Sequence, residues 1–209
     1  MVIDVLRAFT TAAFAFAAGA ESIILVSTVE QALEIRKKNP GHLLIGEIDG
    51  IPIEGFDFGN SPSLFDGLNL KGEHLVQRTT TGTQGVIKLK KTDEILAASL
   101  GNAGATVRYL KKVQPPVITL VTTGLIEGGW GDEDVACADL IEARLLDQEI
   151  DVDEIKKRVI HSKSGQHYFL HQKEFPYADL VCALSIDKFN FMMVVEKSDI
   201  GMIMRAVND

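Results

Sequence analysis

The chain alternates between short apolar runs and longer segments in which apolar residues recur at helical spacing. This alternation is typical of α/β proteins. We expect strands at 2–5, 22–26, 42–46, 74–78, 95–99, 116–122 and 191–196. We expect helices at 10–18, 28–38, 83–89, 104–113, 132–147, 151–158, 165–171 and 178–185. The predicted fold class is α/β, with three layers in the order α/β/α and a mainly parallel sheet.

Two stretches between these elements are expected to be loops. Residues 48–72 are rich in Gly, Pro, Asp and Asn, and a loop of this length inside a compact domain is usually functional. Residues 124–131 form a shorter, glycine-rich loop. Because the sequence shows neither a linker nor a repeat, we expect one domain over residues 1–209, in which residues 148–209 could form a smaller subdomain.

Composition narrows the class of protein. The 209 residues include 21 Lys and Arg against 29 Asp and Glu, which gives a net charge of −8. We therefore expect neither a nucleic acid nor a membrane surface as partner, since both favour basic proteins. Cys137 and Cys182 lack metal-ligand spacing, and the apolar run at 12–20 is too short to cross a bilayer. These features predict a cytoplasmic protein.

The first expected strand ends in a carboxylate that is followed by a cation and two hydroxyls. Asp4 ends the apolar run, Arg7 follows three residues later, and Thr10 and Thr11 open the expected helix. Ligands of open α/β sheets bind beyond the carboxyl ends of the strands, and a helix N-terminus suits an anion. This turn therefore offers a carboxylate for a metal and an arginine for a phosphate. The alternative is that Asp4 caps the helix and Arg7 lies on the surface.

Similar residues follow the next strand of the expected sheet. Glu47 comes directly after the strand at 42–46, and Asn60 and Ser61 lie in the long loop behind it. Because loops after parallel strands converge at one edge, we expect these side chains near Asp4. Turn formation alone is the competing explanation for Asn60 and Ser61.

A threonine-rich loop, TTTGT at 79–83, lies between an expected strand and an expected helix. Hydroxyls, close backbone N–H groups and a helix N-terminus together suit a tetrahedral oxyanion, and Arg78 adds a charge-assisted fork. We therefore expect a phosphate or sulfonate to bind here. The residues expected to bind it are Thr80, Thr81, Gly82 and Thr83. The alternative is a β-branched strand end in which Thr83 caps the helix.

The helix expected at 132–147 begins with three acids, Asp132, Glu133 and Asp134. Acids in a first turn stabilise the helix dipole, which explains many such clusters. A hard cation such as Mg²⁺ also prefers carboxylate oxygens, and Asp134 could hold one together with Asp4 or Glu47. The sequence leaves both explanations open.

Aromatic and imidazole side chains give weaker signals. His161, His167 and His171 have no glutamate that would complete an HExxH motif, so we expect them on the surface. Trp130, the single tryptophan, is expected either to cover the site or to pack.

Five sequence blocks, in this order, resemble the 2-phosphosulfolactate phosphatases. They are VIDVLRA at 2–8, GE at 46–47, GFDFGNSP at 55–62, TTTGT at 79–83, and Glu133-Asp134-x-x-Cys137-Ala138. The first and third blocks are the specific ones, and the resemblance spans nearly the whole chain. Members of this family usually have a further strand region before the first block, so we expect that region to be missing here.

The resemblance implies a Mg²⁺-dependent phosphatase that converts 2-phospho-3-sulfolactate to 3-sulfolactate and phosphate, a step of coenzyme M biosynthesis. On this interpretation Asp4, Glu47 and Asp134 hold the metal, and Asp4, Arg7 and Asp134 are the catalytic residues. The small anionic substrate is expected to contact Thr10, Thr11, Asn60, Ser61, Arg78, Thr80, Thr81, Gly82, Thr83 and Asn102. The family precedent also favours a homodimer.

Two positions depart from the family pattern and leave the substrate open. Phe9 stands where many members have threonine, and Thr81 stands where many have asparagine. The alternatives are a phosphatase for another small phosphorylated hydroxy acid and a non-catalytic anion-binding protein. The nucleophile is either Asp4, which would give an aspartyl-phosphate, or an activated water.

Overall fold

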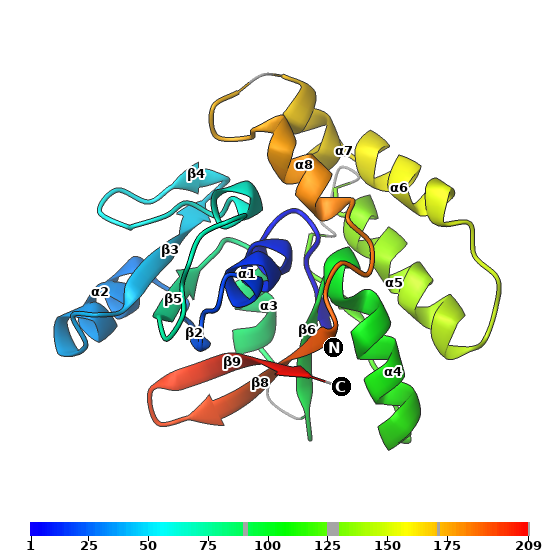
Figure 1. Ribbon diagram of the computed structural model, residues 1–209, viewed down its shortest axis with the longest axis horizontal. Helices are drawn as coiled ribbons and strands as arrows, with labels where there is room; N and C mark the ends of the chain where they lie inside the picture. Colours follow the sequence, from blue (N-terminus) through cyan, green and yellow to red (C-terminus); the bar gives the residue numbers. More distant parts are fainter. Residues whose placement is uncertain (90–91, 125–129, 171, 209) are drawn as a thin grey trace.

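The structure is a computed structural model that describes residues 1–89, 92–124, 130–170 and 172–208. These residues form a mixed α/β fold around a nine-stranded sheet, which confirms the predicted class (Figure 1). The strand order is β4-β3-β5-β2-β9-β8-β6-β1-β7. The strands are β1 (Val2–Ile3), β2 (Ser22–Leu25), β3 (Leu43–Ile48), β4 (Ile51–Pro52), β5 (His74–Arg78), β6 (Ile95–Ala98), β7 (Val121–Thr122), β8 (Phe191–Ser198) and β9 (Gly201–Asn208).

The sheet consists of two parallel blocks joined by an antiparallel hairpin. Strands β3, β5 and β2 are parallel neighbours, and so are β6, β1 and β7. The C-terminal hairpin of β8 and β9 lies between the blocks and pairs antiparallel with both β2 and β6. Among the described strands four pairs are parallel and four antiparallel, so the prediction of a mainly parallel sheet is wrong. The three-layer arrangement stays a prediction.

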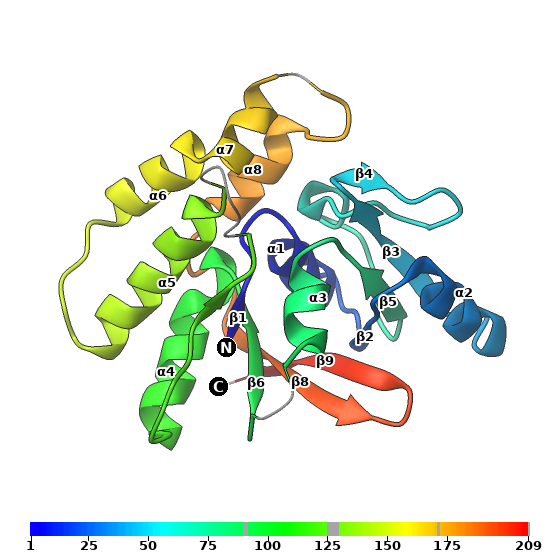
Figure 2. The same cartoon turned by 180° about the vertical axis from the view of Figure 1, so that it is seen from behind.

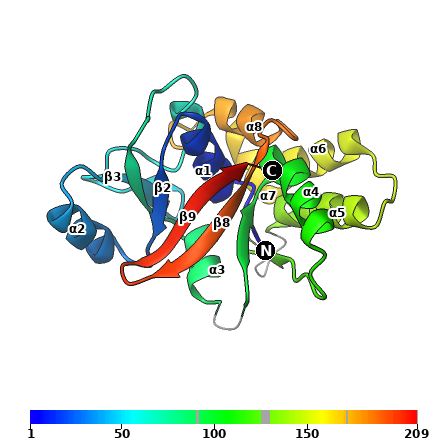
Figure 3. The ribbon, with the colours of Figure 1, turned by 60° about the horizontal axis from the view of Figure 1, so that its bottom comes forward.

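The hairpin is the reason for this difference. The apolar run at 191–196 predicts β8, but β9 and the insertion of both strands at the centre of the sheet were not predicted. Met193 and Met204 are fully buried there. Figure 3 shows the two strands running obliquely beside β2. Whether residues 148–209 form a separate subdomain stays a prediction, although their last two strands belong to the main sheet.

Helices cover the sheet and its end. The α-helices of the described residues are α1 (Ala8–Ala17), α2 (Val29–Lys38), α3 (Gly82–Ile87), α4 (Ala103–Val113), α5 (Asp132–Leu145), α6 (Val152–His161), α7 (Lys163–Gln166) and α8 (Tyr177–Ala183). Short 3-10 helices are η1 (Pro62–Leu64), η2 (Leu100–Asn102) and η3 (His167–Phe169). Helices α4, α5 and α6 pack in a row, and α7 and α8 lie across the end where β1 leads into α1 (Figures 1 and 2).

The predicted elements differ from these bounds mainly at their ends. The strand expected at 116–122 is reduced to β7, and the helix expected at 165–171 is divided between α7 and η3, with residue 171 outside the described residues. Residues 125–129 of the expected loop 124–131 also lie outside them. None of the helices in the described part of the chain is long and apolar enough to cross a membrane.

Helix α1 has apolar residues on every side because it lies inside the protein. Nine of its ten residues are buried. The ring of Phe14 packs edge-on against Phe189 at a centroid distance of 5.1 Å. This packing fixes the turn between β1 and α1, and with it Asp4 and Arg7.

The carboxyl ends of β1 and β5 meet although the two strands do not share a direction along the sheet. Three antiparallel ladders separate β2 from β6, so in a flat sheet the carboxyl ends of β1 and β5 would lie at opposite edges. Thr81, after β5, nevertheless donates a hydrogen bond from its hydroxyl to Asp4, after β1, over 3.0 Å. The expected convergence of these loops is therefore found, although the strands are not parallel neighbours.

Candidate active site

Asp4 lies at the end of β1 with both carboxylate oxygens in hydrogen bonds. Its Oδ1 accepts from the backbone N–H of Ala8 at 2.8 Å, which caps the start of α1. Its Oδ2 accepts from the hydroxyls of Thr81 at 3.0 Å and Thr123 at 3.1 Å. The side chain thus joins the ends of β1, β5 and β7. Only 2% of Asp4 is exposed.

Asp134 enters the same place from the first turn of α5. Its Oδ1 accepts from the backbone N–H of Val5 at 2.7 Å, and its Oδ2 accepts from that of Gly124 at 2.9 Å. The Thr123 hydroxyl lies between the two acids, 3.5 Å from Oδ2 of Asp134. Sequence reasoning missed Thr123, because a single threonine after a short strand carries no distinctive signal.

Burial raises the pKa of both carboxyls. Burial raises the pKa of Asp4 to about 6, and the nearby charge of Glu47 adds to this shift. Burial also holds the pKa of Asp134 well above its ordinary value, with further contributions from the charges of Asp4 and Glu133. No described lysine or arginine donates a hydrogen bond to either carboxylate. The site therefore concentrates negative charge that a cation would stabilise.

Glu47 faces the threonine-rich loop from the end of β3. Its Oε1 accepts from the backbone N–H of Thr80 at 2.6 Å, and its Oε2 accepts from the Thr80 hydroxyl at 3.0 Å and from the N–H of Gly50 at 2.7 Å. Glu47 is 6% exposed. In the first turn of α5, the Oε2 atom of Glu133 is buried and has no hydrogen-bond partner.

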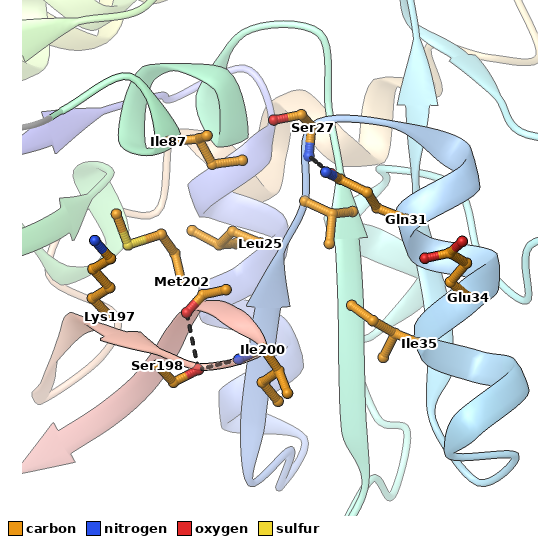
Figure 4. A pocket seen from close by; sticks show the side chains of 12 residues that line it. Leu25, Ser27, Gln31, Glu34, Ile35, Ile87, Lys197, Ser198, Ile200 and Met202 are labelled. Carbon is orange, nitrogen blue, oxygen red and sulfur yellow. Dashed lines mark hydrogen bonds between the residues drawn. The ribbon is translucent and has the colours of Figure 1, made fainter.

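A pocket of about 350 Å³ opens beside these residues. Five of the sequence-predicted residues line it, namely Arg7, Glu47, Asn60, Thr80 and Thr81. A second pocket, of about 270 Å³, lies between α2, α3 and the turn of the β8–β9 hairpin (Figure 4). Its lining, with Leu25, Ile87 and Met202 among others, contains none of the predicted site residues. The first pocket is therefore the candidate active site.

Arg7 is a cation of the pocket lining, and a buried acid holds it in place. Its Nη1 atom donates to Asp179 at 2.9 Å and to the carbonyl of Glu174 at 2.7 Å, and Nη2 donates to the carbonyl of Gly50 at 3.2 Å. The guanidinium also lies 4.8 Å from the ring centroid of Phe175. These contacts fix its orientation at the pocket wall.

Asp179, in α8, is fully buried and was not identified from the sequence. Its second oxygen accepts from the hydroxyl of Ser61 at 2.7 Å and from the backbone N–H and hydroxyl of Ser63 at 3.1 and 2.6 Å. Ser61, which was predicted to contact substrate, thus orients the acid that orients Arg7. Asp179 lies 172 residues from Arg7, so local sequence offers no signal for the pair.

Comparison with known proteins places these residues in a family. A family model described as 2-phosphosulpholactate phosphatase matches residues 1–198. The chain belongs to the 2-phosphosulfolactate phosphatase family. A probable 2-phosphosulfolactate phosphatase of Bacillus subtilis (strain 168) is 31% identical over 212 residues, which cover 99% of this chain and 91% of that protein. Proteins with the same printed name in Synechocystis sp. and Carboxydothermus hydrogenoformans are 36% and 41% identical, and the matches cover 78% and 71% of this chain and 68% and 61% of those proteins.

Membership of the 2-phosphosulfolactate phosphatase family confirms the resemblance drawn from the five sequence blocks. The family and the names of these relatives indicate a phosphatase, which is a hydrolase of phosphoric monoesters. The blocks at 2–8 and 79–83 supply Asp4, Arg7, Thr80 and Thr81, all of which lie at or beside the pocket.

Several residues predicted from the family resemblance lie away from the pocket lining. The Thr10 hydroxyl, in α1, donates to the carbonyl of Val5 in the turn before the helix, and Thr11 is fully buried in α1. Asn102 accepts from the backbone N–H of Ser99 and so closes the turn before α4. Their assignment as substrate-binding residues stays a prediction, and their hydrogen bonds describe structural contacts.

The remaining residues of the threonine-rich loop shape it. Thr83 exchanges hydrogen bonds with Thr79, and Arg78 donates to the carbonyl of Glu47 at 2.7 Å. At Gly82 a Cβ atom would lie 2.7 Å from Oδ2 of Asp4, so glycine is needed for the loop to approach this carboxylate.

The chemistry of the donors fits Mg²⁺, although the carboxylates are not gathered as a closed cluster. Within the described ranges no group of three or more His, Cys, Asp or Glu side chains has the spacing of a metal site. Mg²⁺ is usually held by one or two carboxylates, with water and substrate phosphate completing its oxygen ligands. Asp4 and Asp134 supply two such carboxylates. His167 and Trp130 line the opposite side of the pocket.

Proposed function

We propose that the chain is a Mg²⁺-dependent phosphatase for phosphorylated 2-hydroxy acids, with 2-phospho-3-sulfolactate as the reference substrate of its family. The product of that reaction is 3-sulfolactate, as in coenzyme M biosynthesis. The observation that carries the proposal is the pair of buried carboxylates, Asp4 and Asp134, beside a pocket lined by hydroxyls and an arginine. Acids with strongly shifted pKa values cluster at functional sites.

Asp4 and Asp134 are the residues that would hold the metal, and Glu47 would contribute from the opposite side through water. When bound, Mg²⁺ supplies positive charge to a phosphate oxygen and so favours attack at phosphorus. Arg7 would donate hydrogen bonds to an acid group of the substrate, since its guanidinium is held rigidly by Asp179. The hydroxyls of Thr80 and Thr81 would donate to the remaining phosphate oxygens.

Hydrolysis forms one bond to phosphorus and breaks another. In the proposed reaction a water oxygen bonds to phosphorus, the bond between phosphorus and the ester oxygen breaks, and a proton reaches the leaving alcohol. We favour water over Asp4 as the nucleophile, because both oxygens of Asp4 already accept hydrogen bonds from three donors. A stable fluoroberyllate adduct on Asp4 of the wild-type protein would contradict this choice.

Replacement of Asp4 tests the proposal. In Asp4→Asn the amide oxygen can still accept from Ala8, while the amide nitrogen can donate to the hydroxyls of Thr81 and Thr123. The variant should fold, bind Mg²⁺ more weakly by calorimetry, and lose roughly 100-fold or more of its phosphatase activity. The control is Asp139→Asn, whose partly exposed ion pair with Arg158 lies on another face of α5. Wild-type activity and Mg²⁺ affinity in Asp4→Asn would refute the proposed site.

A further inference from the structure

Tyr168 brings a buried hydroxyl to the wall of the candidate pocket. The residue lies in η3, lines the pocket and is only 2% exposed. Its ring packs edge-on against Phe175 at a centroid distance of 5.8 Å. Among the described residues, however, no group forms a hydrogen bond with its hydroxyl. Buried tyrosine hydroxyls ordinarily have a partner, because an unpaired buried polar group costs free energy. The pocket wall therefore contains a hydrogen-bond donor that the protein does not use itself.

Arg7, on the same wall, also keeps part of its hydrogen-bonding capacity. Its guanidinium carbon lies 5.9 Å from the ring centroid of Tyr168. The Nη1 atom donates to Asp179 and to the carbonyl of Glu174, and Nη2 donates to the carbonyl of Gly50. Among the described residues, the Nε–H group and the second N–H group of Nη2 have no acceptor. These two groups lie on one edge of the guanidinium, the arrangement that binds both oxygens of a carboxylate.

The charges that act on the Tyr168 hydroxyl associate it with Arg7. Burial raises the pKa of this hydroxyl well above its ordinary value, so it stays protonated and can donate. The positive charge of Arg7 opposes this shift, and it is the strongest of the charges that act on the hydroxyl. The acids Asp179, Asp4 and Glu133 have smaller effects. The hydroxyl therefore belongs with the Arg7 end of the pocket rather than with the end formed by Asp4.

A substrate carboxylate fits the donors at this end. Thr80 and Thr81, which lie next to Asp4, are the proposed donors to the phosphate. In a phosphorylated 2-hydroxy acid the carboxylate is attached to the carbon that bears the phosphate ester, so the two groups must bind close together. A carboxylate has about four lone-pair sites. It can therefore accept from the Nε–Nη2 edge of Arg7 and from the hydroxyl of Tyr168 at the same time.

Resting on the proposed phosphatase activity, we infer that the Tyr168 hydroxyl donates a hydrogen bond to the substrate carboxylate that Arg7 binds, and so determines specificity for 2-hydroxy acids. Hydrogen bonds to charged groups contribute more than those between neutral groups. A phosphate ester that lacks the carboxylate leaves both donors unpaired, so the site discriminates against it. The inference concerns the carboxylate alone and applies whatever the third substituent of the acid is.

Tyr168→Phe tests this role, because it removes one oxygen and keeps the ring against Phe175. Two esters that differ only in the carboxylate are compared with Mg²⁺, namely 2-phospho-3-sulfolactate and 2-sulfoethyl phosphate. For the first we expect kcat/KM to fall about tenfold or more, mainly through a higher KM, and for the second to fall less than about twofold. The products 3-sulfolactate and 2-hydroxyethanesulfonate, tested as inhibitors, give the same comparison where an ester is hydrolysed too slowly.

Tyr177→Phe is the matched control. Tyr177, in α8, is 55% exposed and does not line the pocket, so its variant should hydrolyse both esters as the wild type does. Tyr168→Phe should also be at least as stable as the wild type in urea, since an unpaired buried hydroxyl contributes no stability.

Three results would overturn the inference and leave the phosphatase proposal intact. These are equal losses of kcat/KM for both esters in Tyr168→Phe, wild-type values for both esters, and failure of this variant to fold. Failure to fold would show that the hydroxyl has a structural partner. Absence of Mg²⁺-dependent phosphate release from both esters by the wild-type protein would instead refute the phosphatase proposal itself.

Discussion

Asp4 and Asp134 occupy positions in which a carboxylate charge is unfavourable without a cation. Burial raises both pKa values, and nearby acids add to the shifts, although five backbone and hydroxyl donors point at the four oxygens. Residues that lower the stability of the folded protein in this way are common at functional sites. Both acids could be found from sequence, because each stands at a point where an element ends or begins. That the two acids lie near each other could not be found from sequence, since 129 residues separate Asp134 from its hydrogen-bond partner Val5.

The raised pKa of Asp4 predicts that its neutral analogue is more stable. The folded protein keeps the Asp4 proton up to a pH of about 6, whereas the unfolded chain loses it near 4. The folded state therefore binds more protons in this window, and the contribution of Asp4 to stability falls as pH rises from about 4 to 6. In Mg²⁺-free buffer at pH 7.5, Asp4→Asn should raise the free energy of unfolding by on the order of 2 kcal/mol. At pH 4 the difference should largely vanish.

Urea unfolding of both proteins at the two pH values measures this difference. Added Mg²⁺ should stabilise the wild type more than Asp4→Asn, since the variant lacks one of the carboxylates proposed to hold the metal. A variant that is less stable than the wild type at pH 7.5 would show that the Asp4 charge is already well compensated within the protein.

The buried pair of Arg7 and Asp179 predicts an effect on substrate binding. Asp179→Asn keeps an acceptor for Ser61 but removes the charge that holds Arg7. We expect KM to rise about tenfold with a smaller change in kcat, together with a loss of stability of about 3 kcal/mol. Asp179→Glu should recover part of the affinity.

The control variant is Asp139→Asn, which breaks a comparable but partly exposed ion pair with Arg158 and should lower the free energy of unfolding by less than about 1 kcal/mol. Equal kinetics in Asp179→Asn and the wild type would exclude a role for Arg7 in substrate binding.

At the scale of elements, the site depends on how closely α3 approaches the β1–α1 turn. Most elements follow from the sequence, because their apolar spacing is regular. The close approach does not, because it rests on one missing side chain, that of Gly82. The sequence did mark the loop at 79–83 as unusual. It placed Thr10 and Thr11 at the start of a helix, whereas α1 begins at Ala8 and buries both.

Gly82→Ala tests this close approach. The added Cβ would lie 2.5 Å from the Cβ of Ala8 and 2.7 Å from Oδ2 of Asp4, so α3 or Asp4 must move. We expect a loss of stability of about 1–3 kcal/mol and reduced activity. Gly41→Ala is the matched control, since no atom lies within 4 Å of its added Cβ and its stability should change by less than about 0.5 kcal/mol. Thermal unfolding of the two variants gives the comparison, and similar values would mean that the loop has room at position 82.

At the scale of the whole molecule, the C-terminal hairpin holds the two parallel blocks together. Strands β8 and β9 occupy the centre of the sheet, although they are the last elements of the chain. The sequence could not show this, since strand order depends on packing between distant segments rather than on local period. The same insertion makes the sheet mixed, because β8 and β9 pair antiparallel with each other and with β6 and β2. Among the described residues that line the candidate pocket, none comes from this hairpin.

Substitutions in β9 measure this contribution. Met204 is fully buried between the blocks, and Arg205, its neighbour, is exposed. Met204→Ala should lower the free energy of unfolding by about 2–5 kcal/mol because it leaves a cavity in the core. Arg205→Ala should change it by less than about 0.5 kcal/mol. Denaturant unfolding compares the two, and a small effect at Met204 would contradict the central position of β9.

The most direct test of the account is release of inorganic phosphate by the purified wild-type protein, with and without Mg²⁺. The substrates are 2-phospho-3-sulfolactate, 2-phospholactate and 2-phospho-3-phenyllactate, and Asp4→Asn serves as the inactive reference. We expect release that requires Mg²⁺, that EDTA abolishes, and that Asp4→Asn loses. Release that is indifferent to Mg²⁺ and to Asp4, or no release from any substrate, would contradict the assignment of this pocket as the active site of a phosphatase.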